Sequence, residues 1–147
     1  MASRRRAREF ALQALYQSDV GDDSVQKALQ GLWAGLVEET DEELGKRQAE
    51  SDEIEFATGL CIGIEAKRDE LDQRIEASST NWRVPRMSVI DRNILRMGAF
   101  ELSSMPEVPA NVSINEAIEL AKRFGTKDSK GFVNGILDRI ARDLGRV

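Results

Sequence analysis

Four arginines lie within the first eight residues: Arg4, Arg5, Arg6 and Arg8. Ser3 is a good N-cap, so we expect a helix that begins directly after it and holds three of these arginines in its first turn. Cations there are disfavoured by about 0.3–1 kcal/mol each, because the positive end of the helix dipole lies at that turn. A bound polyanion would reverse this penalty, since guanidinium groups match phosphate oxygens and backbone N–H groups point outward there. The alternative is a frayed, solvated terminus.

Tyr16 follows further along the same predicted helix. Its ring is either an edge of the core or a platform on which an unpaired nucleobase stacks. The helix that carries the arginines is therefore a candidate surface for single-stranded nucleic acid.

The remaining composition excludes most catalytic chemistry. The chain has no histidine and one cysteine, which excludes Ser–His–Asp and Cys–His catalysis, ordinary zinc sites and a disulfide framework. Cys61 stands between Leu60 and Ile62, a setting that predicts a buried, unreactive thiol. No Walker loop, GxGxxG or EF-hand pattern is present, and the carboxylates lie in acidic runs that we expect to be solvated. We expect no enzyme activity, no metal site and no cofactor.

The charge is segregated along the chain. The formal net charge is −5 and the pI is about 4.9, yet residues 1–10 carry four arginines against one acid. Residues 38–55 carry nine acids against two bases, whereas residues 83–96 have a net charge of +3 and residues 122–147 a net charge of +4. Such a chain can present a positive face to a polyanion although it is acidic overall.

No membrane or targeting segment is expected. Polar residues interrupt the apolar pattern after the N-terminal arginines, and the longest nearly uncharged apolar stretch, 56–64, is far shorter than the ~20 residues that span a bilayer. We therefore expect a cytoplasmic protein that does not contact membranes.

The apolar periodicity is helical nearly throughout and predicts an all-α fold of about seven helices. The predicted helices cover residues 4–21, 24–37, 54–64, 69–76, 89–102, 114–124 and 129–144. Residues 38–43 are expected to form an acidic loop. With 147 residues the chain is expected to be one domain, 1–147, whose helical halves, about 1–80 and 81–147, meet near the turn-rich residues 77–87.

Several local expectations follow from single residues. Ser88 with Asp91, and Ser113 with Glu116, have the spacing of capping boxes, and Asp128 is expected to cap the last helix. The helix after Ser88 is apolar on more than one side and is expected to be the most buried. Gly59 and Gly63 lie four residues apart on one helix, which favours a close helix crossing there. Asp91 and Glu101 lie on a mostly apolar helix, and we expect an ion pair with a neighbouring arginine.

Ordered sequence blocks resemble the NusB family of transcription antitermination factors. They are residues 4–16 (RRRAREFALQALY), 90–102 (IDRNILRMGAFEL), 112–122 (VSINEAIELAK) and 132–138 (FVNGILD). The resemblance covers essentially the whole chain, with residues 22–55 matched poorly.

The resemblance implies a non-enzymatic, all-α protein of two helical subdomains. Members of the family pair with NusE, a small-subunit ribosomal protein in a second role, and bind the boxA element of nascent RNA. The complex acts with the RNA polymerase elongation complex and other Nus factors. It promotes read-through of terminators, above all in ribosomal RNA operons.

The resemblance also implies an RNA-binding site. Its residues here are Arg4, Arg5, Arg8, Tyr16, Asp128 and Phe132, with Arg92 as a further candidate. From the residues alone, Asp128 is an N-cap and Phe132 is equally a core residue. Gly131 stands where many members have a basic residue, so a backbone phosphate contact is expected to shift to Lys127 or Lys130.

Two other functions are compatible with the sequence. One is an RNA-guiding domain related to RNA methyltransferases, for which a catalytic domain would be expected after Val147. The other is a helical module that binds only proteins and pairs its arginines with an acidic partner. A homodimer is also possible, and the sequence does not decide it.

Overall fold

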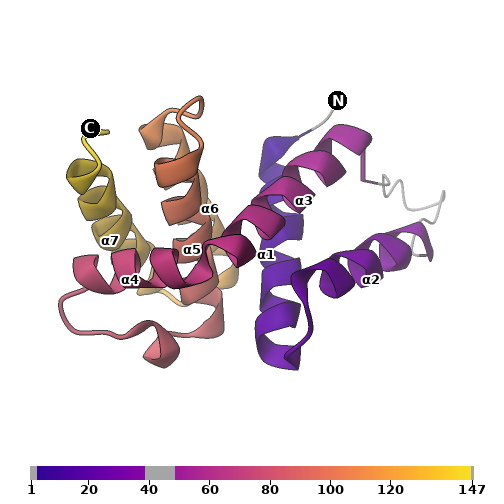
Figure 1. Cartoon of the computed structure of the whole chain (residues 1–147), viewed down its shortest axis with the longest axis horizontal. Coiled ribbons are helices and arrows are strands. Elements are labelled where there is room, and N and C mark those ends of the chain that lie inside the picture. The colour runs from indigo at the N-terminus through magenta and orange to yellow at the C-terminus, as the bar shows by residue number, and fades with distance from the viewer. Residues whose placement is uncertain (1–2, 39–48, 147) are drawn as a thin grey trace. The chain divides into compact units, whose positions relative to one another are not determined.

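The computed structural model describes residues 3–38 and 49–146 of the chain (Figure 1). Within these residues the chain forms seven α-helices, one 3-10 turn and no strand, so the all-α prediction is confirmed. The elements are α1 (Arg4–Gly21), α2 (Val25–Glu38), α3 (Ser51–Ala66), α4 (Arg68–Ser78), η2 (Val84–Arg86), α5 (Val89–Ser104), α6 (Ala110–Phe124) and α7 (Ser129–Asp143). The acidic loop expected at 38–43 lies outside the described residues, except that Glu38 ends α2. None of the described helices is long and apolar enough to cross a membrane.

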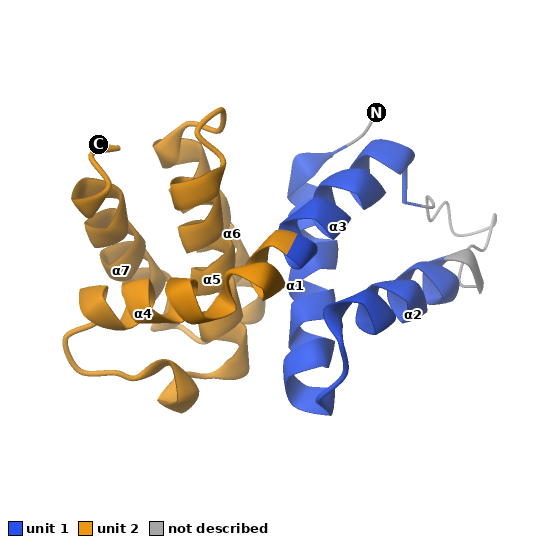
Figure 2. Cartoon of the chain, in the orientation of Figure 1, with its two compact units in different colours: residues 1–62 blue, residues 63–147 orange. Residues whose placement is uncertain are grey.

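The chain divides into two compact units, Met1–Ile62 and Gly63–Val147 (Figure 2). The boundary lies inside α3, whereas the sequence suggested halves that meet near residue 80. The difference is α4, which packs against α5 and α7 and so lies in the second unit. A paired contact fixes it there, because the buried Arg96 guanidinium donates to both Asp72 carboxylate oxygens, at 2.8 and 3.0 Å.

The first unit contains α1, α2 and the first turns of α3. The Ser3 hydroxyl accepts a hydrogen bond from the backbone N–H of Arg6 at 3.2 Å, so the predicted N-cap of α1 is confirmed. Helix α2 begins after Ser24, whose hydroxyl accepts the N–H of Lys27 at 3.2 Å. The Cys61 thiol is buried as predicted.

The second unit is built around α5, in which nine of sixteen residues are buried. Gly98 allows α5 and α7 to approach closely, because a Cβ there would lie 2.5 Å from Leu137 Cδ1. Gly63 has the same role against the Phe100 ring, which a Cβ would approach to 2.7 Å at Cε2. The prediction of a close crossing at Gly59 is wrong, because nothing lies within 4 Å of a Cβ at that position.

Helices α5, α6 and α7 run alternately up and down within this unit. Ser113 near the start of α6 donates a hydrogen bond to Glu101 near the end of α5, at 2.9 Å. Arg146, just after α7, donates to the carbonyls of Leu102 at 2.8 Å and Val108 at 2.7 Å. Leu102 lies in the last turn of α5 and Val108 in the connection after it, so the end of α7 lies beside the end of α5. The start of α5, the end of α6 and the start of α7 therefore share the opposite end of the unit (Figure 1).

The hydrogen bond from Ser113 to Glu101 corrects the predicted capping box at Ser113. Helix α6 begins at Ala110, with Pro109 at the N-cap position, so Ser113 lies inside the helix and is 1% exposed. Its hydroxyl faces the buried Glu101 carboxylate rather than a backbone N–H. The predicted cap at Ser88 is confirmed, since its hydroxyl accepts the N–H of Asp91 at 3.1 Å.

Candidate nucleic-acid interface

A buried carboxylate from α3 holds the arginine-bearing end of α1. Glu53 is 1% exposed and accepts the backbone N–H groups of Ser3 at 3.1 Å and Glu50 at 2.9 Å. Its Oε1 also lies 3.5 Å from Arg6 Nη1. Glu53 belongs to the acidic run that was expected to be solvated, so that expectation is wrong at this residue. The contacts join the N-cap of α1 to the first turn of α3.

Two of the predicted RNA-binding arginines pack on the ring of Phe56, one turn further along α3. The guanidinium carbons of Arg4 and Arg8 lie 4.9 and 5.3 Å from the centroid of its ring. Arg4 remains exposed, whereas Arg8 is only 3% exposed. Arg8 therefore packs inside the first unit, and Arg4 presents its charge at the surface beside it.

Arg5 and Tyr16 are the other predicted residues on α1. Both are exposed, Tyr16 at 41%. They are eleven residues apart, which is close to three helical turns and about 16 Å of rise, so they lie on one face of α1. Arg6 faces elsewhere, because it pairs with Glu53 and lies 5.0 Å above the Phe10 ring. An exposed cation and an exposed aromatic ring thus share one helix face.

The other predicted residues lie in the second unit. Asp128 occupies the N-cap position of α7 as expected, but its side chain makes no capping hydrogen bond. The Ser129 hydroxyl accepts the N–H of Thr126 at 2.9 Å, which fixes the connection before the helix rather than capping α7. Asp128 is exposed and Phe132 is half-buried one turn later. The carboxylate and the aromatic ring are therefore both presented at the start of α7.

The residues around this helix start are basic. Lys127 and Lys130 are exposed, and neither side chain has an ion-pair partner among the described residues. Arg92, half-buried in the first turn of α5, donates from Nη1 to the Pro85 carbonyl at 3.5 Å. Gly131 has open space around it, so the missing side chain leaves the backbone of the first turn of α7 accessible.

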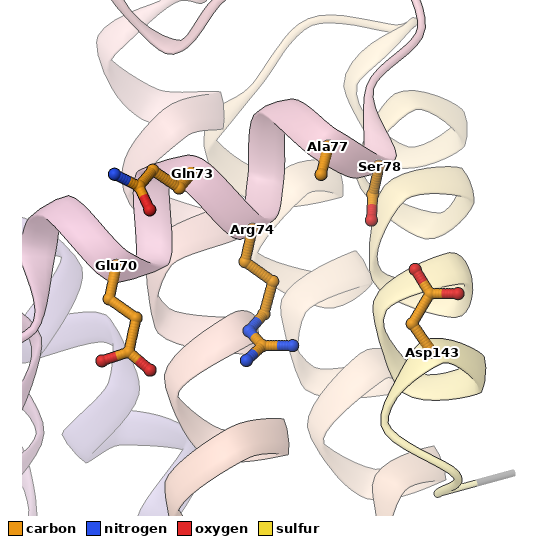
Figure 3. A pocket seen from close by; sticks show the side chains of 6 residues that line it. All are labelled: Glu70, Gln73, Arg74, Ala77, Ser78 and Asp143. Atoms are coloured by element: carbon orange, nitrogen blue, oxygen red, sulfur yellow. The ribbon is translucent and has the colours of Figure 1, made fainter.

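A separate hollow of about 300 Å³ lies between α4 and α7 (Figure 3). Its lining residues are Glu70, Gln73, Arg74, Ala77, Ser78 and Asp143. Arg74 Nε is buried there without a hydrogen-bond partner among the described residues. The lining carries two acids and one arginine, so this hollow lacks the excess positive charge of a phosphate site. In the described part of the chain, no three His, Cys, Asp or Glu side chains are grouped as a metal site.

The fold and the charged helix starts define a small all-α protein with candidate polyanion-binding surfaces. Residues 5–142 match the model of the NusB family, so the chain belongs to this family. The transcription antitermination protein NusB of Myxococcus xanthus is 49% identical over 146 residues, 99% of each chain. NusB of Geotalea uraniireducens is 47% identical and covers 96% of this chain and 95% of its own.

Solved structures agree with this assignment. NusB of T. maritima superposes with a TM-score of 0.82 at 36% identity and covers 97% of this chain and 94% of its own. A chain from a structure described as antitermination factors NusB and NusE in complex with dsRNA superposes with a TM-score of 0.79 at 24% identity. It covers 95% of this chain and 96% of its own, and at that identity it supports the fold.

Proposed function

We propose that this chain is a transcription antitermination factor that binds boxA RNA together with NusE. In this role it would act with the RNA polymerase elongation complex and other Nus factors, and promote read-through above all in ribosomal RNA operons. It acts in the cytoplasm as an adaptor and catalyses no reaction. Membership of the NusB family supports the proposal, and NusE is the partner with which a NusB of the same fold was solved.

The observation that carries the proposal is the fixed, arginine-rich start of α1. Glu53 and the Ser3 cap hold this turn in place, and the turn itself contains no acidic residue. A phosphate at this turn would interact favourably with the helix dipole as well as with Arg4 and Arg5. Tyr16, on the same face as Arg5, then offers a ring on which an unpaired base can stack.

The second unit contributes base recognition in this proposal. The Asp128 carboxylate, free of a capping bond, can accept a hydrogen bond from a base amino group, and Phe132 offers a partly exposed ring one turn away. Lys127 and Lys130 supply the phosphate contacts that the family places beside this helix start, where this chain has Gly131. Arg92 adds charge through its position in the first turn of α5. Arg8 supports the site from inside, by packing against Phe56.

The test is the salt dependence of RNA binding by an Arg5→Gln variant. Fluorescence anisotropy with labelled boxA RNA should show weaker binding, and the slope of log affinity against log salt concentration should flatten by about one unit, since one phosphate contact is lost. The matched control is Arg68→Gln, which removes an exposed arginine at the start of α4. A scrambled RNA and titrations with and without NusE complete the set.

Two results would contradict the proposal. One is boxA binding by Arg5→Gln that equals binding by the control at every salt concentration. The other is equal affinity for boxA and scrambled RNA with and without NusE, which would favour a module that binds only proteins. A homodimer that covers the basic turn would lower RNA affinity as protein concentration rises, which light scattering during the titration would reveal.

A further inference from the structure

Trp82 is exposed on the connection between α4 and α5. Half of it, 51%, is accessible to solvent, which is unusual for the largest apolar side chain. Its indole has no ring partner among the described residues, whereas the chain's other tryptophan, Trp33, packs edge-on against Phe10 at 5.4 Å. The exposed indole is a feature that the fold itself does not require.

The connection that carries Trp82 is held in place. The backbone N–H of Trp82 donates to the Ser79 hydroxyl at 3.2 Å, and the backbone N–H of Val84 donates to Glu76 Oε1 at 2.9 Å. Val84, the first residue of the η2 turn, and Met87, which follows the turn, are buried. The indole is therefore presented by a pre-organised backbone, so that binding to it costs little ordering of the chain.

Two exposed arginines follow Trp82 within four residues. Arg83 and Arg86 are exposed, and neither has an ion-pair partner within the described residues. Because α5, α6 and α7 alternate in direction, the η2 turn lies at the same end of the second unit as the start of α7 (Figure 1). That end also carries the exposed Lys127 and Lys130.

The acids at this end do not balance the cations. The acids are Asp91 at the α5 start, Asp128 in the α6–α7 connection and Glu76, whose carboxylate accepts the Val84 N–H, against four exposed bases and Arg92. An exposed aromatic ring on the same short connection as two exposed arginines matches the requirements of a single-stranded nucleic acid, whose bases stack and whose phosphates need cations. An acidic protein would use the cations but would leave a solvated indole without a specific partner of its own.

We propose that the Trp82 turn is a second RNA contact, on which an unpaired base stacks while Arg83 and Arg86 bind the adjoining phosphates. The inference rests on the proposed function and extends it. The strand that is read at the start of α7 continues along the same end of the second unit. RNA that extends beyond boxA therefore binds more tightly than boxA alone.

The experiment compares boxA RNA alone with boxA RNA extended by unpaired nucleotides on its 5′ or its 3′ side. Trp82→Ala should lose about 5- to 100-fold in affinity for one extended RNA, the loss expected for one stacked base. Trp82→Phe should recover most of it. Arg83→Gln with Arg86→Gln should weaken the same RNA and flatten its salt dependence, whereas Arg68→Gln with Arg139→Gln, with the same net charge, should not.

Fluorescence gives an independent readout. In a Trp33→Phe variant Trp82 is the only tryptophan, so its emission should be quenched when the extended RNA saturates the protein. Unchanged emission, or equal affinity of Trp82→Ala and the wild type for both extended RNAs, overturns this inference and leaves the α1 site intact. Weaker NusE binding by Trp82→Ala with unchanged RNA binding also overturns it, and assigns the turn to a protein partner. If no RNA binds the wild-type chain, with or without NusE, the proposed function fails together with this inference.

Discussion

Replacing Glu53 by alanine should both destabilise the first unit and weaken RNA binding. The carboxylate is buried, and it accepts the N–H groups of Ser3 and Glu50 at 3.1 and 2.9 Å while facing Arg6 at 3.5 Å. The substitution removes the acceptor and leaves these donors beside an apolar methyl group. The first turn of α1 then loses its attachment to α3.

The magnitude follows from these contacts. A hydrogen bond to a charged group contributes about 1.5–3 kcal/mol, and removing one partner of a buried ion pair costs about 3–5 kcal/mol. The Arg6 guanidinium keeps partial access to solvent, with 26% of its side chain exposed, so its loss is the smaller part. We expect the free energy of unfolding to fall by about 3 kcal/mol, of which the two backbone hydrogen bonds supply most.

Urea denaturation followed by circular dichroism measures this loss, and hydrogen exchange at the N–H groups of Ser3 and Arg6 locates it. Glu55→Ala is the matched control, because Glu55 is an exposed glutamate two residues further along α3. It should change the free energy of unfolding by less than about 0.5 kcal/mol. Equal stability of the two variants would refute the idea that Glu53 fixes the arginine-bearing turn. Unchanged boxA affinity in Glu53→Ala would separate that turn from RNA binding.

Two further substitutions test the packing of the second unit. Gly125→Ala should lower the free energy of unfolding by about 1–3 kcal/mol, because the new Cβ would lie 2.6 Å from Ser129 Cβ; Gly131→Ala, which meets nothing within 4 Å, should raise it by about 0.5–1 kcal/mol. The melting temperature should rise from Gly125→Ala through the wild type to Gly131→Ala. A Gly125→Ala variant as stable as the wild type would contradict the close approach of Gly125 to Ser129. Arg146→Ala should lower the free energy of unfolding by about 1–3 kcal/mol, since its guanidinium donates to the carbonyls of Leu102 and Val108. Urea denaturation at equal m-value measures this loss. An unchanged free energy of unfolding would show that these hydrogen bonds do not stabilise the second unit.

The helices could be predicted from the sequence because most of their signals are local. The Ser3 and Ser88 caps each depend on residues within one turn. Ser113 misled because its spacing to Glu116 fits a capping box, while the partner that decides its place is Glu101 on another helix. A cap and a buried hydroxyl have the same local pattern, and only tertiary contact distinguishes them.

The candidate site was predictable in composition and less so in arrangement. Arginines and an aromatic ring on the first helix follow from the sequence, but their separate roles do not. Arg8 is buried and Arg4 exposed, although both guanidinium groups lie over the Phe56 ring of α3. Neither Phe56 nor Glu53 stood out, since one lies within an apolar run and the other within an acidic one. Both act across elements about 50 residues apart, a separation that periodicity does not address.

The net charge of a segment likewise does not show which of its cations can reach a ligand, because the fold decides that. Arg96 and Arg146 contribute to the positive segments 83–96 and 122–147, yet one pairs with Asp72 and the other holds backbone carbonyls, so neither is offered to a ligand. The exposed Arg83, Arg86, Lys127 and Lys130 come from two segments about 40 residues apart, and the alternation of α5, α6 and α7 brings these four to one end. A polyanion meets that end as one surface. Removing a cation there should therefore alter RNA binding more than removing an exposed cation of equal charge elsewhere on the same unit.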